Sequence, residues 1–145
     1  MKRHPTLAHL SRDHHPALIL AQLLKRNAAS YKGLPTDTEG KMQYATRFYE
    51  GELLKHFEEE EKMMDILTSI DPSMDKMIKE IRMEHGDLRN LFTGISYKAD
   101  AVTALDELGT SLDNHIRKEE RQFFPLIEKN CDDETMAAID KLLTL

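Results

Sequence analysis

Histidine and glutamate recur four residues apart at two places in the chain. His56 is followed by Glu60, and His115 is followed by Glu119. Residues four apart lie on one face of a helix, so each pair would present an imidazole and a carboxylate side by side. Both pairs also fall on the apolar stripe of their segment, where an uncompensated charge is very costly. This position predicts that a further group pairs with each of them.

Two more histidines extend this pattern into an internal repeat. The strings LSRDH and IRMEH end at His14 and His85, and each places an acid directly before the histidine. In both, the histidine follows an apolar residue by one helical turn and is expected to point inward. The alignment favours His14 as the inward histidine of the first string, and a shift by one residue keeps His15 as the alternative.

Together the repeats predict a dinuclear metal site at mid-height of a helix bundle. Imidazole suits iron, zinc or copper, and carboxylate suits iron or manganese. A mixed nitrogen and oxygen set without thiolate, deep in a bundle, points first to two irons, with zinc or manganese as alternatives. A structural zinc would use about four ligands, often including Cys. The predicted ligands are His14 (or His15), His56, Glu60, His85, His115 and Glu119.

Neighbouring charged residues are expected to stay outside this site. Glu59 is rotated off the apolar stripe, and Glu120 is rotated by about 140° from His115, so we expect it to face solvent. We expect the remainder of the acidic run 58–61 to form a solvated face of its helix. Arg89, one turn after His85, is expected to extend outward with its charge in water.

Four long segments with a helical apolar period must position these residues. Apolar residues recur at i, i+3 or i+4 and i+7 in each segment. Asp71 and Asp100 are predicted N-caps, and Pro72 is predicted to take a first helical position. The pattern predicts an all-α, antiparallel up-down-up-down four-helix bundle with a short C-terminal helix within 132–145. Helix-breaking residues separate the segments at 33–40, 71–72, 96–100 and 130–133.

Pro16 conflicts with the first helical segment. A proline inside a helix removes a backbone hydrogen bond and costs about 3 kcal/mol or bends the helix. Either the helix begins near Asp13, or it bends beside His14 and His15. Local conflicts of this kind tend to lie at functional sites.

Composition limits the remaining classes of function. The 145 residues, 40% hydrophobic and 32% charged, predict a single domain over 1–145. No apolar run approaches the roughly 18 residues of a membrane-spanning helix. A net charge of −6 without a basic block argues against nucleic-acid or anionic-membrane partners. The single cysteine, Cys131, cannot form an internal disulfide, which favours the cytoplasm.

The chain resembles hemerythrin-like, or HHE cation-binding, domains, whose signature is His…His-x-x-x-Glu, twice. The strings RDHHPAL, HFEEEE, MEHGDLRNLF and HIRKEERQFFPLIE carry the resemblance over nearly the whole chain. The last string is the most specific, because His-x-x-x-Glu-Glu followed by an aromatic residue and proline is typical of the family's fourth helix. The resemblance implies a non-haem di-iron centre, oxo- or hydroxo- and carboxylate-bridged, held by the six residues named above, with Glu60 and Glu119 as bridges.

The chain departs from the oxygen-carrying members of that family. Those members have two histidines one turn apart on the third helix, whereas here Arg89 follows His85. The resemblance therefore implies a four-histidine, two-glutamate site, as in members linked to nitric oxide or iron–sulfur repair. The Cys-bearing N-terminal region usual in those members is not present in these 145 residues.

We expect a protein that binds or reacts with O2, peroxide or nitric oxide, for sensing, detoxification or iron and oxygen buffering. If it is an enzyme, it is an oxidoreductase acting on peroxide or nitric oxide. No flavin or nicotinamide fingerprint is found, so electrons would come from a protein redox partner. The alternatives are a metal-free helical interaction module and an iron-centre repair or nitric-oxide-stress protein.

Overall fold

The computed structural model describes residues 3–143, and every regular element within that range is helical, which confirms the all-α prediction. The α-helices are α1 (Pro5–Leu24), α2 (Thr38–Phe48), α3 (Leu54–Leu67), α4 (Pro72–Gly94), α5 (Ala101–Lys118), α6 (Phe124–Asn130) and α7 (Asp133–Leu143). Three short helical segments adjoin them: the π-helical η1 (Tyr49–Leu53) and η3 (Glu119–Phe123), and the 3-10 helix η2 (Ile95–Tyr97).

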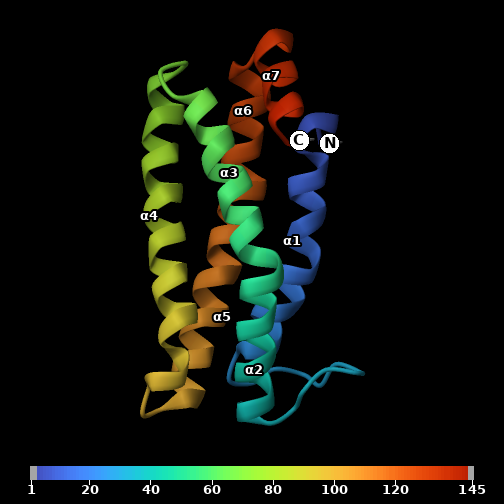
Figure 1. Ribbon diagram of the computed structural model, residues 1–145, viewed down its shortest axis with the longest axis vertical. Helices are drawn as coiled ribbons and strands as arrows, with labels where there is room; N and C mark the ends of the chain where they lie inside the picture. Colours follow the sequence, from blue (N-terminus) through green and yellow to red (C-terminus); the bar gives the residue numbers. More distant parts are fainter. Residues whose placement is uncertain (1–2, 144–145) are drawn as a thin grey trace.

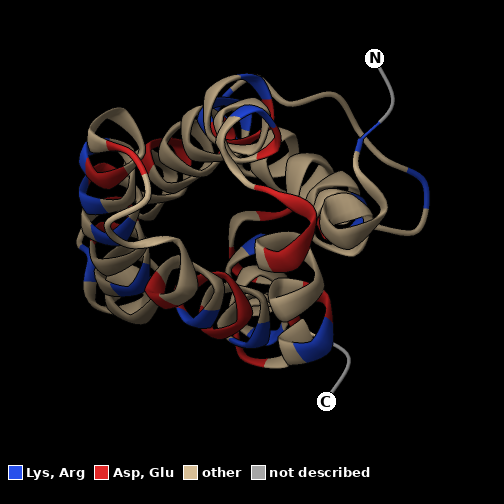
Figure 2. Cartoon of the chain, turned by 90° about the horizontal axis from the view of Figure 1, so that it is seen from above, with Lys and Arg blue, Asp and Glu red and all other residues tan. Residues whose placement is uncertain are grey.

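The long elements lie alongside one another in Figure 1. We call each of the long elements α1, α2–η1–α3, α4 and α5–η3–α6 a rod; the second and the fourth run on through a π-helical segment without a break. These rods share one long direction, and α7 lies at the end of the molecule where α3 meets α4. Seen from above, acidic and basic residues are interspersed around the ring of helices (Figure 2). No helix among the described residues is long and apolar enough to cross a membrane.

Two apolar clusters fill opposite ends of the bundle. One lies at the α2 end and includes Leu20, Tyr49 and Leu108. The other lies at the α7 end and includes Leu10 and Met63. In every rod the predicted ligands fall between residues of these two clusters, so the fold places a polar layer at mid-height between two dry cores.

Local sequence signals set the helix boundaries. Asp71 accepts a hydrogen bond from the backbone N–H of Met74 at 3.0 Å, and Asp100 accepts one from Thr103 at 3.1 Å, so both predicted N-caps are confirmed. Pro72 occupies the first turn of α4, as predicted. α1 begins at Pro5 and runs through Pro16, so the helix does not begin near Asp13.

α1 and α5 pack closely, and Gly109 explains how. A Cβ atom at Gly109 would lie 2.6 Å from the carbonyl oxygen of Ala21, closer than atoms can approach. Only glycine therefore allows the two helices this separation. The contact sets the spacing between the helices that carry His14 and His115.

The two π-helical segments were not predicted. A π turn adds one residue to a helical turn, and such turns are frequent at functional sites. Glu119 is the first residue of η3, and His56 lies three residues beyond the end of η1. A helical wheel drawn at 3.6 residues per turn assumes a regular helix, so it does not show where a residue is added.

Candidate metal centre

The six predicted ligands meet in the polar layer between the apolar clusters. They come from α1, α3, α4, α5 and η3, and all are buried. His15 is exposed and lies outside this group, so the structure places His14 there instead. The six residues retain exposed fractions of 3% at His14, 4% at His56, 0% at Glu60, 0% at His85, 3% at His115 and 0% at Glu119.

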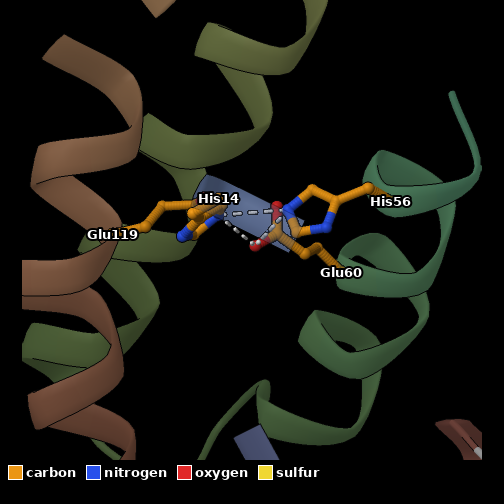
Figure 3. Close-up of side chains that lie close together, drawn as sticks. All are labelled: His14, His56, Glu60 and Glu119. Carbon is orange, nitrogen blue, oxygen red and sulfur yellow. Dashed lines mark hydrogen bonds and ion pairs between the residues drawn. The ribbon is translucent and has the colours of Figure 1, made fainter. Parts of the chain in front are cut away.

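The residues form two overlapping groups of four, each able to hold a metal ion. The first quartet is His14, His56, Glu60 and Glu119, and the second is Glu60, His85, His115 and Glu119. Within each quartet, one nitrogen or oxygen atom per residue lies within 4.8 Å of the others. Figure 3 shows the side chains of the first quartet pointing toward one another, with His56 and Glu60 coming from α3, His14 from α1 and Glu119 from η3. Glu60 and Glu119 belong to both quartets, as two bridging carboxylates would.

The inward atoms of the quartets are close but imperfectly paired. In the first quartet, the Nε2 atoms of His14 and His56 lie 3.2 Å apart, and His14 Nε2 lies 3.0 Å from Glu119 Oε1. In the second, His85 Nε2 lies 3.1 Å from Glu60 Oε1, and His115 Nε2 lies 3.4 Å from Glu119 Oε1. All four imidazoles thus direct Nε2 at the two shared carboxylates.

Four buried atoms at the centre have no hydrogen-bond partner among the described residues. They are Oε2 of Glu60, both carboxylate oxygens of Glu119 and Nε2 of His115. Leaving a buried polar atom unsatisfied costs roughly 1–3 kcal/mol, and more for a charged group. All four belong to residues of the two quartets, so bound cations would satisfy them together, and the donor set fits metal ions.

Without metal, the two shared carboxylates have pKa values shifted in opposite directions. Burial and the neighbouring Glu60 raise the pKa of Glu119 well above its usual value. Burial also disfavours the ionised Glu60, but His56 and His85 outweigh it and hold the pKa of Glu60 well below its usual value. Of the two, Glu119 is therefore the carboxylate that takes up a proton more readily, and metal binding would displace such a proton.

The pKa values of His56, His85 and His115 are shifted in different directions. Burial opposes the charged form of His56, yet Glu60 and Asp13 raise its pKa to about 10. In the same way Glu60 and Glu61 raise the pKa of His85 to about 9, against the effect of burial. Burial lowers the pKa of His115. The metal-free site thus holds two imidazolium ions beside the charged Glu60.

Each of the four histidines also contacts an acid through its outer nitrogen. The Nδ1 atom lies 2.6 Å from Glu120 in His14 and 3.0 Å from Asp13 in His56. The corresponding distances are 2.7 Å from Glu61 in His85 and 2.8 Å from Glu84 in His115.

Sequence reasoning missed these acids, and two expectations about them were wrong. Glu120 does not face solvent, because its carboxylate binds His14 and the hydroxyl of Ser11. Glu61 is not a solvated member of its acidic run. A signal was available, since each of the four acids stands next to a predicted ligand in the sequence.

Arg89 does not point freely into water. Its guanidinium donates two hydrogen bonds to Glu61, at 2.8 and 3.1 Å, and lies over the ring of Phe57. The charge of Arg89 is thereby paired with the acid that holds His85. A cation at this position supports His85 of the second quartet from outside, through Glu61.

Aromatic rings and small cavities surround the centre. Phe57 stacks on His85 with ring centroids 4.3 Å apart, and Phe124 stacks on His14 at 5.5 Å. A cavity of about 270 Å³ reaches His115 from outside, beside Glu84. A larger cavity, of about 580 Å³, lies at the end of α1 and touches none of the six residues, so its size does not make it the site.

Comparison with protein-family models gives one match, to the hemerythrin HHE cation binding domain, over residues 6–127. That range includes all six residues of the quartets and all four acids behind them. No curated protein and no solved structure matches the chain.

Proposed function

The chain belongs to the hemerythrin HHE cation-binding family, and from that premise we propose that it is a non-haem di-iron protein that binds or reacts with O2, peroxide or nitric oxide. One observation carries the proposal: two buried quartets of imidazole and carboxylate groups share Glu60 and Glu119. A single tetrahedral zinc would use three or four of these groups and leave the others buried without a partner.

His14 and His56 would hold one ion, and His85 and His115 the other, with Glu60 and Glu119 reaching both. Iron is proposed first because imidazole and carboxylate without thiolate suit it, and zinc or manganese would fit the same donors. When bound, an iron pair would supply reversible one-electron chemistry and open positions for a small ligand. We propose that this ligand is sensed, detoxified or buffered in the cytoplasm.

The chain's own residues would supply the environment of the centre. Phe57 and Phe124 cover one imidazole of each quartet. The apolar clusters at both ends exclude bulk water, which strengthens electrostatic interactions in the layer between them. Access for a small molecule would come from the sides of the bundle, where the cavity beside His115 lies.

The finer description of the fold belongs to the same proposal. We propose that α1, the α2–α3 rod, α4 and the α5–α6 rod form an up-down-up-down four-helix bundle, with α7 as the short C-terminal helix. The single domain 1–145 has no nucleic-acid or membrane partner. The interspersed charges of Figure 2 support this, because they form no basic face.

Metal analysis tests the proposal directly. Protein from iron-replete cells, or reconstituted anaerobically, should contain close to two iron ions per chain by plasma emission spectrometry. A metal content near zero after reconstitution would leave the metal-free interaction module as the function. Turnover with peroxide or nitric oxide and a reducing partner would make the protein an oxidoreductase, whereas binding without turnover would make it a sensor or buffer.

A further inference from the structure

We propose that Asp13, Glu61, Glu84 and Glu120 form a closed ring of positioning residues, the outer carboxylate ring, in which each rod orients a ligand histidine of the next. The inference rests on the proposed metal site and extends it to residues outside the quartets. Each acid contacts the Nδ1 atom of one histidine at 2.6 to 3.0 Å.

The contacts run once around the bundle. Asp13 of α1 holds His56 of α3, and Glu61 of α3 holds His85 of α4. Glu84 of α4 holds His115 of α5, and Glu120 of η3 returns the chain of contacts to His14 of α1. Every rod therefore gives one acid and has one of its histidines held. A displacement of any rod would alter two ligand positions.

The chemistry of each contact sets which nitrogen can bind metal. A carboxylate only accepts hydrogen bonds, so each Nδ1 must donate its N–H to the acid. The unprotonated nitrogen of the neutral imidazole is then Nε2, which faces the shared carboxylates. An acid on the far nitrogen also fixes the ring orientation and makes the ligand nitrogen more basic. Loss of such a partner typically weakens metal affinity by about 10- to 100-fold.

Three acids of the ring are themselves held in place by cations. Arg89 donates two hydrogen bonds to Glu61, and Lys118 lies 2.8 Å from Glu84. Arg3 lies 3.2 Å from Glu120, which also accepts from Ser11 at 2.7 Å.

Asp13 differs from the other three. Among the described residues, its carboxylate contacts the imidazoles of His56 and, at 3.9 Å, His9, and contacts no lysine or arginine. The link between Asp13 and His56 is therefore the least supported of the four.

The ring makes a prediction that a merely structural role would not make. Asp13 and Glu120 serve histidines of the first quartet, and Glu61 and Glu84 serve histidines of the second. Replacing one acid by its amide should therefore loosen one of the two metal ions and leave the other as it was. Release of metal to a chelator would then become biphasic, with one ion per chain leaving about 10- to 100-fold faster.

The experiment compares Asp13→Asn, Glu61→Gln, Glu84→Gln and Glu120→Gln with Glu58→Gln, an exposed acid of the same run. Proteins loaded with Co²⁺ report ligand geometry through their visible spectrum and are then challenged with a colorimetric chelator. Circular dichroism of the metal-free variants shows whether each is folded. We expect biphasic release and an altered spectrum in the four ring variants, and wild-type behaviour in Glu58→Gln.

A variant that does not fold is replaced by the conservative Asp13→Glu, Glu61→Asp, Glu84→Asp or Glu120→Asp, which keeps the charge and should retain metal better than a neutral side chain. Wild-type protein that holds two ions, with ring variants that release both at the Glu58→Gln rate, would overturn the ring and leave the proposed function standing. Wild-type protein that binds no metal would overturn both.

Discussion

The first quartet takes its histidines from α1 and α3, and the second takes them from α4 and α5. Both use the same residue types and share Glu60 and Glu119. Their surroundings differ, because both acids behind the second quartet contact a permanent cation, Arg89 or Lys118. In the first quartet, the acid behind His56 contacts one other histidine and, within residues 3–143, no lysine or arginine.

The two quartets also differ in the aromatic rings that stack on their histidines and in the cavities that reach them. Phe57 stacks on His85 at 4.3 Å, more closely than Phe124 on His14 at 5.5 Å. A cavity of about 270 Å³ reaches the second quartet at His115, and one of only about 30 Å³ reaches the first at His56. The comparison shows that a duplicated motif sets the kind of ligand, whereas neighbouring helices set how firmly each ligand is held and how it is reached.

The largest effect should come from the residues that the two quartets share. Glu60→Ala and Glu119→Ala should reduce the metal content from close to two ions per chain to near zero, because each variant removes a ligand from both quartets. Glu59→Ala, which alters a carboxylate bound to His9 instead, should keep both ions. Metal analysis decides this, and equal loss in all three variants would show that the acidic run acts as a block.

Histidine variants should separate the quartets. His14→Ala should lose mainly the first ion and His85→Ala mainly the second, so each should leave about one ion per chain. His15→Ala is the matched control for His14, because the neighbouring imidazole is exposed, and it should retain both ions. A larger metal loss in His15→Ala than in His14→Ala would contradict the assignment.

Oxygen should oxidise the reduced iron-loaded protein without reversible carriage. The third helix offers His85 but no second imidazole one turn later, since Arg89 there is bound to Glu61. The second quartet would therefore keep an extra position for water or a small ligand, which favours oxidation. Stopped-flow mixing with oxygen should show decay to a ferric spectrum within seconds, and full recovery of the ferrous protein on removing oxygen would contradict this.

Alkaline pH should destabilise the metal-free protein more than the metal-loaded protein. In the metal-free state the pKa of His56 is raised to about 10 and that of His85 to about 9. A raised histidine pKa contributes stability that is complete below the ordinary value of about 6.5 and is lost as the pH rises through the folded value. Metal ligation uses the neutral imidazole, so the loaded protein should not lose this contribution.

Thermal unfolding from pH 6.5 to 10 tests that difference between the two states. The melting temperature of the metal-free protein should fall over this range, and its gap to the loaded protein should widen. His56→Gln should remove the later part of the fall and His85→Gln the earlier part. A gap that narrows with rising pH would contradict the prediction.

The smallest effect should come from the cation behind the second quartet. Arg89→Ala frees Glu61 without removing it, so release of the second ion should accelerate by about 3-fold, consistent with a partly exposed ion pair worth up to about 1 kcal/mol. Arg82→Ala, which breaks an exposed pair with Asp65, is the control and should not change release. Faster loss of the first ion in Arg89→Ala would show that the quartets are not separately supported.

Much of this arrangement follows from the sequence alone. Helical periodicity, the caps at Asp71 and Asp100, and the spacing of His56 from Glu60 are local features. A repeat that places histidine and glutamate on an apolar stripe also predicts that they face inward, because burying them needs a partner. The helical class and the six candidate ligands were accessible for this reason.

Tertiary structure decided what lies behind those ligands. The contact between His14 and Glu120 joins residues 106 positions apart, and that between His115 and Glu84 joins residues 31 apart. A helical wheel gives the direction of a side chain relative to its own axis but not which neighbouring helix it meets. Glu120 and Glu61 therefore looked solvated until the rods were packed together. The π turn that begins at Glu119 was hidden because a wheel drawn at 3.6 residues per turn assumes a regular helix, whereas one added residue changes the direction of the side chains that follow it.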